Sequence, residues 1–189
     1  MGCASGAAVT TGANNTLIGA SAGDALTTGN NNVAVGKSAL STEDVGSRSV
    51  AIGYAALSVQ NVDGDIYNTA VGYAAGGAVT TGARNTLIGG SAGDALTSGS
   101  YNTAMGYGAL STEDAHGTNT AIGYDALNVL NAGTDGYNTA VGMQAGLSVS
   151  TGLKNTLIGA NAGDALTTGD NNIIIGKDAA ASAVGVDNE

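Results

Sequence analysis

The chain has 189 residues, with 32 glycines but no proline, phenylalanine or tryptophan, and a formal net charge of −10 with only five basic residues. So few lysines and arginines argue against nucleic acid or an anionic membrane surface as a partner, because clustered basic side chains hold both. The one cysteine, Cys3, excludes an internal disulfide framework, and no stretch approaches the ~18 apolar residues of a membrane-spanning helix.

Glycines that each end a short apolar run recur along the chain in steps of 17 residues, apart from two steps of 19. Every landmark also recurs after 70 residues, which is four registers. A fixed period of this kind is typical of a repeat protein. It predicts one β-solenoid domain over residues 1–189, with 70-residue repeats at 13–82 and 83–152 and a partial copy at 153–189. The glycine series is Gly19, Gly36, Gly53, Gly72, Gly89, Gly106, Gly123, Gly142, Gly159 and Gly176.

Each register contains a predicted strand immediately before its glycine. The residues usually read Asn, Thr or Val, Ala or Leu, Val or Ile, and Gly, so alternate side chains fall on opposite faces. β-Branched residues bounded by turn formers favour strands, and nothing repeats at the 3.6-residue period of a helix. In chain order we expect ten strands of about five residues, each followed by a second short strand around an alanine. Stacked at ~4.8 Å per rung, they form an all-β parallel solenoid or β-roll roughly 50 Å long.

Asparagine stands four residues before the glycine in nine of the ten registers, and Ser49 takes its place in the tenth. Stacked identical side chains form ladders, so we expect each amide to hydrogen-bond the amides above and below it. The predicted structural ladder consists of Asn15, Asn32, Asn68, Asn85, Asn102, Asn119, Asn138, Asn155 and Asn172.

Two registers are longer than the others, and we place their extra residues in edge loops at residues 61–65 and 131–135. Oxygens at Asn61, Asp63 and Asp65 have a spacing that resembles calcium-binding loops. The second loop keeps only Asp135 of the two carboxylates. An ordinary solvated turn is therefore favoured, with a calcium site as the alternative, and no other metal site or cofactor is predicted.

Two motifs resemble catalytic sequences. Ser21 and Ser91 lie in G-x-S-x-G patterns like a nucleophile elbow, but the third copy has Asn161, and the one histidine falls in a predicted loop. Residues 35–38 resemble the end of a phosphate-binding loop that lacks its first glycine. Since the repeat accounts for both motifs, we predict that the protein is not an enzyme.

All seven tyrosines fall between Tyr54 and Tyr137. They predict either packing between neighbouring rungs or a platform for sugar rings, and the latter makes a polysaccharide-binding module one candidate function. The candidate platform comprises the four that directly follow a glycine, which are Tyr54, Tyr73, Tyr107 and Tyr124. The other three, Tyr67, Tyr101 and Tyr137, precede an asparagine.

Threonine usually stands three residues before the strand-ending glycine, and valine, isoleucine or methionine stands directly before it. Each of these two positions forms a column along the rod. If the threonine column faces outward, it suits ice binding, whereas an inward column belongs to the core. Because both strand faces are small and apolar, the sequence leaves open which face is inside. The unbroken part of the column is Thr69, Thr86, Thr103, Thr120, Thr139 and Thr156.

The runs Asn32–Gly36, Ser49–Gly53 and Asn68–Gly72 resemble the N-S-V-A-I-G head repeat of YadA-like trimeric autotransporter adhesins. The longer run Asn119–Leu127 is similar to repeats of bacteriophage tail-fibre proteins. The resemblance implies a left-handed β-roll and a homotrimer whose contact uses the alanine-bearing face. The alanines concerned are Ala34, Ala51, Ala70, Ala104, Ala121 and Ala140.

The same resemblance implies a function as a structural and adhesive rod. Such a rod is expected on a cell or virion surface, as part of a longer protein, where it binds a host-surface glycan or protein by avidity. The turns of this chain are longer than the family's head repeat. We therefore consider the adhesive rod first, an ice-binding solenoid second and a polysaccharide-binding module third.

Overall fold

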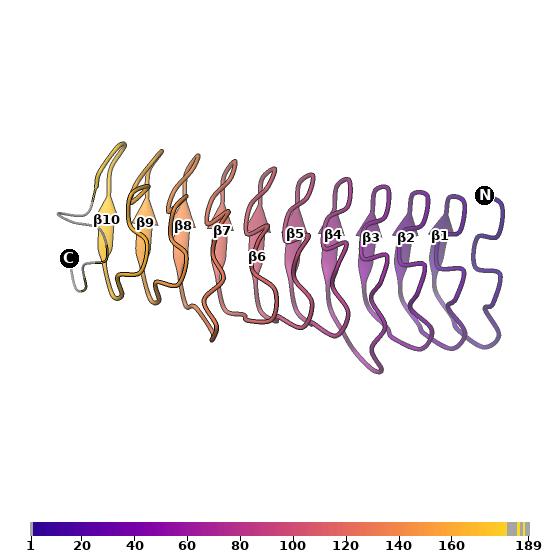
Figure 1. Cartoon of the computed structure of the whole chain (residues 1–189). Helices are drawn as coiled ribbons and strands as arrows, with labels where there is room; N and C mark the ends of the chain where they lie inside the picture. Colours follow the sequence, from indigo (N-terminus) through magenta and orange to yellow (C-terminus); the bar gives the residue numbers. More distant parts are fainter. Residues whose placement is uncertain (1, 181–184, 186, 188–189) are drawn as a thin grey trace.

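The structure is a computed structural model that describes residues 2–180, 185 and 187, and it confirms the predicted all-β solenoid. Ten parallel strands form one sheet in chain order, and the described residues contain no helix. The ends of the predicted domain, residues 1, 181–184, 186, 188 and 189, lie outside the described residues. Figure 1 shows the turns stacked into a rod with the chain termini at opposite ends. The strands are β1 (Thr16–Ile18), β2 (Val33–Val35), β3 (Val50–Ile52), β4 (Thr69–Val71), β5 (Thr86–Ile88), β6 (Thr103–Met105), β7 (Thr120–Ile122), β8 (Thr139–Val141), β9 (Thr156–Ile158) and β10 (Ile173–Ile175).

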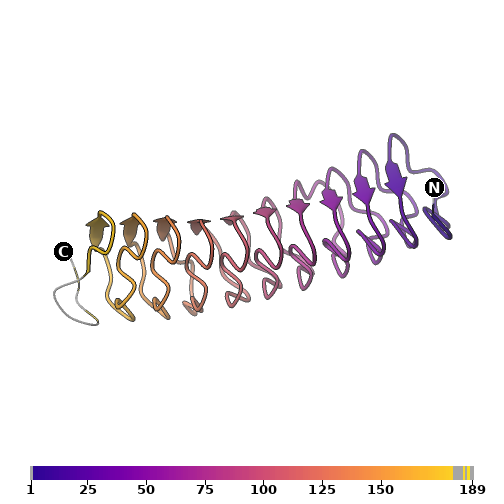
Figure 2. The same cartoon turned by 90° about the horizontal axis from the view of Figure 1, so that it is seen from above.

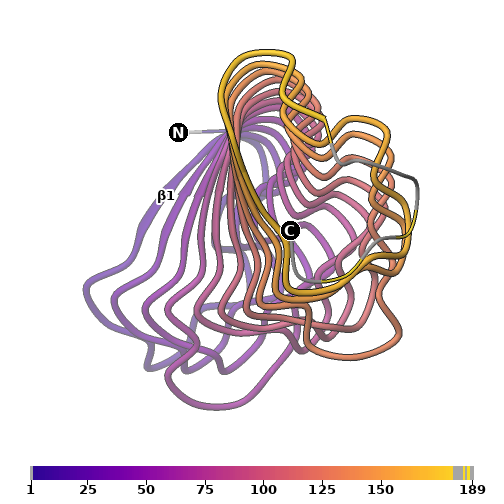
Figure 3. The same ribbon diagram turned by 90° about the vertical axis from the view of Figure 1, so that its left-hand side faces the viewer.

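Equivalent residues of neighbouring turns pair in register. Ala34 of β2 pairs with Ala51 of β3, which in turn pairs with Ala70 of β4. The 17- and 19-residue steps therefore bring like residues into straight columns. The sheet twists slowly, as strands of L-residues do, and Figures 2 and 3 show the turns rotating gradually along the axis.

Each turn has one strand of three residues, and the second strand that we predicted around the alanine is a turn instead. The backbone there is left-handed at alternate residues, with φ of 57° at Ser38 and 52° at Leu40. Hydrogen bonds still connect the rungs, because the Ser38 N–H donates to Ala20 O at 2.9 Å and the Leu40 N–H donates to Ala56 O at 3.0 Å. The left-handed residues prevent a second sheet while preserving the bonds between turns.

The glycine that follows each strand permits close approach of successive turns. At Gly72, φ is +146°, and a Cβ would lie 2.3 Å from the carbonyl oxygen of Gly89 in the next turn. Both the backbone angle and the lack of space exclude a side chain at this position. The recurrent glycine is thus a requirement of the stacking.

The alanine column faces the interior, and the prediction that it forms a trimer contact is wrong. Each of its alanines is fully buried within the single chain, so no partner chain reaches it. Alternation along the strand places the central residue inside and its two neighbours outside. The six buried alanines are Ala34, Ala51, Ala70, Ala104, Ala121 and Ala140.

Leucine interrupts this column where glycine stands across the core. A Cβ added at Gly93 would lie 2.8 Å from Leu87 Cδ2, and one added at Gly76 would lie 2.6 Å from Leu87 Cδ1. In other turns the small residue lies in the strand and the large residue lies across the core from it. Ala34 of β2 and the buried Leu40 are one such pair. The narrow core is therefore filled by complementary volumes, as close packing requires.

The asparagine column is a ladder, but most of its bonds join side chains to backbone. The N–H of Asn102 donates to Asn85 Oδ1 at 2.9 Å, and Asn85 Nδ2 donates to the carbonyl oxygen of Gly99 at 2.9 Å. Direct bonds between column amides occur from Asn138 to Asn119 at 3.4 Å and from Asn172 to Asn155 at 3.1 Å. From Asn15 to Asn155, each side-chain oxygen thus accepts the backbone N–H at the ladder position of the next turn.

Gln60 supplies the amide that the ladder lacks at Ser49. Its Nε2 donates to Ser49 Oγ and to Glu43 Oε2, both at 3.0 Å, and its Oε1 accepts a bond from Asn68 Nδ2 at 2.8 Å. Burial raises the pKa of the Glu43 carboxyl above its ordinary value, and hydrogen bonds from Gln60 and the backbone oppose that shift. This buried network keeps the column continuous through the exceptional turn.

Candidate binding surface

The outer face of the sheet carries the residues that flank the central, inward residue of each strand. The threonine column from Thr69 to Thr156 is half-buried and points outward. The structure thus decides which face of each strand is inside, a point that the sequence leaves open. The third residue of each strand is also outward, and Ile18 at one end of the rod is 49% exposed. This face is therefore a regular array of threonine and aliphatic side chains.

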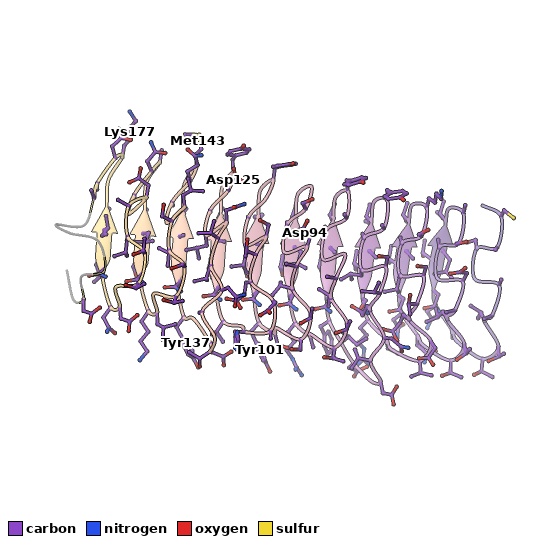
Figure 4. The ribbon with its side chains drawn as sticks, viewed as in Figure 1. Asp94, Tyr101, Asp125, Tyr137, Met143 and Lys177 are labelled. Carbon is purple, nitrogen blue, oxygen red and sulfur yellow. The ribbon has the colours of Figure 1, made fainter. Side chains whose placement is uncertain are left out.

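Two columns of mostly exposed side chains border the outer face. The post-glycine column contains the residue after each strand-ending glycine, and the pre-asparagine column contains the residue before each ladder position. Figure 4 shows them at opposite edges, with Met143 and Lys177 along the upper edge and Tyr101 and Tyr137 along the lower. Together they hold all seven tyrosines and all five basic residues of the chain. The post-glycine column is Ala20, Lys37, Tyr54, Tyr73, Gly90, Tyr107, Tyr124, Met143, Ala160 and Lys177, and the pre-asparagine column is Asn14, Asn31, Arg48, Tyr67, Arg84, Tyr101, Thr118, Tyr137, Lys154 and Asn171.

The four candidate platform tyrosines form two stacked pairs. The ring centroids of Tyr54 and Tyr73 lie 5.3 Å apart with an interplanar angle of 10°, and those of Tyr107 and Tyr124 lie 6.0 Å apart at 13°. Tyr73 is 65% exposed, and Lys37 Nζ lies 5.9 Å from the Tyr54 centroid. The predicted packing between rungs is confirmed, while a sugar platform stays a prediction.

A hydrogen bond with the Asp125 carboxylate raises the pKa of the Tyr124 phenol above its ordinary value.

From Arg48 to Tyr101, the pre-asparagine column alternates arginine with tyrosine, an arrangement that sequence reasoning missed. The Arg84 guanidinium lies 5.4 Å from the Tyr101 ring centroid, and its Nη1 donates to the Tyr101 hydroxyl at 3.2 Å. Arg48 makes the same contacts with Tyr67 and also forms an ion pair with Asp65. The signal was present in the sequence as basic and aromatic residues at the same register position.

The candidate calcium ligands lie in the longer loop at residues 61–65, and a calcium site there stays a prediction. Asn61, Asp63 and Asp65 are exposed, and Arg48 engages the Asp65 carboxylate. Over the described part of the chain, one group of acidic and histidine side chains, Glu113, Asp114 and His116, has metal-ligand atoms within 4.8 Å of one another. Its buried member, Glu113, already contacts His116 Nδ1 at 3.2 Å and accepts the Ala132 N–H at 3.3 Å.

The residues of the G-x-S-x-G pattern have structural roles. Gly89 directly follows β5, and Gly93 provides the room that Leu87 fills. Ser91 lies between them in a left-handed turn, with φ of 52°. No pocket is found among the described residues.

Comparisons with protein-family models, with curated proteins and with solved structures gave no match. Among the described residues there is no helix long and apolar enough to span a membrane. Evidence about function therefore comes from the exposed columns of the rod and the outer face of its sheet.

Proposed function

We propose that the chain is a structural and adhesive module, a rigid rod that binds a polysaccharide or another host-surface component through exposed tyrosines. The observation that carries this proposal is the presence of two exposed, stacked tyrosine pairs along one edge. Individual contacts of this kind are weak, but repetition along one rod gives avidity. In keeping with the resemblance to adhesin heads and tail fibres, we place the rod outside the cell, on a cell or virion surface, within a longer protein.

Rigidity is supported by hydrogen bonds on more than one side of the rod. Strand bonds, turn bonds such as that from Leu40 to Ala56, and ladder bonds such as that from Asn102 to Asn85 all link successive turns. A ligand-binding residue on such a scaffold keeps its spacing to the next one. Aligned columns therefore suit repetitive ligands.

We also propose that rods associate as homotrimers. Since the alanine column is buried, the contact would use the outer face, where an aliphatic column runs from Ile18 to Ile175. Light scattering after size exclusion tests this directly. A mass of three times 18.0 kDa supports the trimer, and a mass of 18.0 kDa contradicts it.

Retention on insoluble cellulose and chitin tests the adhesive proposal. We expect the native protein to sediment with at least one of them, and a variant with Tyr54, Tyr73, Tyr107 and Tyr124 all changed to alanine to stay in solution. A matched variant with Tyr67, Tyr101 and Tyr137 changed to alanine should still sediment. Equal loss in both variants, or no retention of the native protein, would contradict the proposal.

Ice binding is a second candidate, favoured by the outward orientation of the threonine column. Threonine side chains repeat at ~4.8 Å along a single sheet face, which gives a regular array of hydroxyls. Val33, Val50 and Ile173 interrupt the column. Thermal hysteresis in the native protein that Thr103→Tyr abolishes would support this function, and its absence in the native protein would remove it.

A further inference from the structure

One turn in the middle of the tyrosine column has no side chain at its edge. Gly90 lies between Tyr73 on the preceding rung and Tyr107 on the following one. At ~4.8 Å per rung, the two tyrosines are separated by two rungs, or ~9.6 Å. The stack of rings is therefore interrupted by an opening one rung wide.

The backbone does not require glycine at this position. The φ angle of Gly90 lies outside the left-handed region, and the equivalent positions 70 residues away are Ala20 and Ala160. Apart from its chain neighbours, a Cβ at Gly90 would meet only the Tyr107 ring, with Cδ2 at 3.3 Å and Cε2 at 3.7 Å. The opening is thus bordered by Tyr107 on one side and is unfilled toward Tyr73.

Stacking leaves one ring face on each side of this opening. Tyr73 stacks on Tyr54 with one face, and Tyr107 stacks on Tyr124 with one face. The remaining faces of Tyr73 and Tyr107 border the Gly90 rung. At the outer end of the first pair, Lys37 lies over the Tyr54 ring, so that face is already in contact with a side chain.

We propose that the Gly90 rung is a subsite for one pyranose ring of a neutral polysaccharide, stacked between Tyr73 and Tyr107. Since ~9.6 Å separates the rungs of Tyr73 and Tyr107, a sugar ring between them can lie within the ~4.5–7 Å range of stacked rings from Tyr73, and the Tyr107 ring, which approaches the Gly90 backbone, closes the other side. The apolar C–H faces of a pyranose suit these two contacts, since each contact removes apolar surface from water.

The ligand is assigned as neutral because of the charge around the column. The nearest basic residue of this column is Lys37, three rungs away, and the whole chain carries a formal net charge of −10. A polymer of uronic acids would be repelled by that field. This inference rests on the proposed adhesive function and specifies where one sugar of the ligand binds.

Calorimetric titration with cellohexaose, chitohexaose and hexagalacturonate tests the subsite. We expect the native protein to bind at least one neutral hexasaccharide and to bind hexagalacturonate more weakly. Gly90→Tyr fills the rung and should lower the affinity by about tenfold or more, because two ring faces are lost. The matched control, Ala160→Tyr, adds a tyrosine at the same column position, between Met143 and Lys177, and should bind as the native protein does.

Single substitutions separate the subsite from an extended platform. Tyr73→Ala and Tyr107→Ala should each weaken binding more than Tyr54→Ala and Tyr124→Ala do. Thermal melting followed by circular dichroism should be nearly unchanged in Gly90→Tyr, since four other turns carry tyrosine at this position. An equal loss in all four tyrosine variants, with native affinity in Gly90→Tyr, would overturn the subsite while leaving the adhesive function in place.

Two further outcomes also count against the subsite. Stronger binding of hexagalacturonate than of the neutral sugars would overturn the assigned ligand class, and no binding of any hexasaccharide by the native protein would overturn the site. Retention on cellulose and chitin then decides the adhesive function separately.

Discussion

Replacing Asn85 by alanine removes one step of the buried ladder. The side chain is fully buried, and it accepts the N–H of Asn102 and donates to the carbonyl oxygen of Gly99, both at 2.9 Å. Alanine leaves that N–H and that carbonyl without their partner inside the core. The neighbouring core is filled by apolar side chains such as Leu87 and Leu96, which offer those two groups no other partner.

The expected cost follows from these two stranded groups. Leaving a buried donor or acceptor unsatisfied costs ~1–3 kcal/mol, so two such groups predict a loss of about 2–6 kcal/mol. A typical domain has only ~5–15 kcal/mol of stability, so one substitution removes a large share of it. Because each turn of a solenoid contacts only its neighbours, the damage should be concentrated around the turns of Asn85 and Asn102.

Urea unfolding followed by far-UV circular dichroism measures the loss, and amide hydrogen exchange locates it. The backbone N–H of Asn102 should lose its protection from exchange, whereas the backbone N–H groups of distant turns should keep theirs. Arg84→Asn is the matched control, because it changes the adjacent exposed residue to one that the same position carries at Asn14 and Asn31. We expect the control to stay within ~0.5 kcal/mol of the native protein. A loss below ~1 kcal/mol in Asn85→Ala, with normal protection of Asn102, would refute the role assigned to the ladder.

Two further predictions concern the core. Leu87→Ala should lower the free energy of unfolding in urea by ~2–5 kcal/mol, because it leaves a cavity. Adding Gly93→Leu should restore most of this loss, because it recreates the arrangement of Ala34 and Leu40. Additive losses in the double variant would contradict this prediction. Because the pKa of Glu43 is raised above 4.5, the folded state binds its proton more tightly than the unfolded state, so its contribution to stability is lost as the pH rises through the folded pKa. Glu43→Gln should flatten that decline in urea midpoints measured between about pH 4 and pH 8, and parallel profiles for the two proteins would contradict it.

Much of the fold was predictable because the repeat makes each position visible many times. The alternation around Asn68 and Ala70 marks a strand, and the glycine after it marks the end of that strand. The ladder was predictable as a column, but its partners were not. An amide that stacks on another amide and an amide that bonds to the backbone of the next turn have the same spacing in the sequence.

The turns after each glycine were predicted wrongly for a physical reason. Leu40 and Leu57 have φ angles of 52° and 49°, a region that residues with a branched side chain seldom occupy. Local preference therefore favours a strand there. Bonds between turns, such as that from Leu40 to Ala56, and burial of the leucine side chain offset the cost of the left-handed backbone.

By itself, the sequence determined the period, the strand positions and the contents of every column, because equal spacing in a solenoid forces like residues to stack. Only the tertiary structure decided which columns face solvent. Ala70 and its neighbours Thr69 and Val71 are all small enough for either side, so composition does not distinguish the faces. The choice depends on the direction in which the chain turns after Gly72, and contacts between successive turns set that direction.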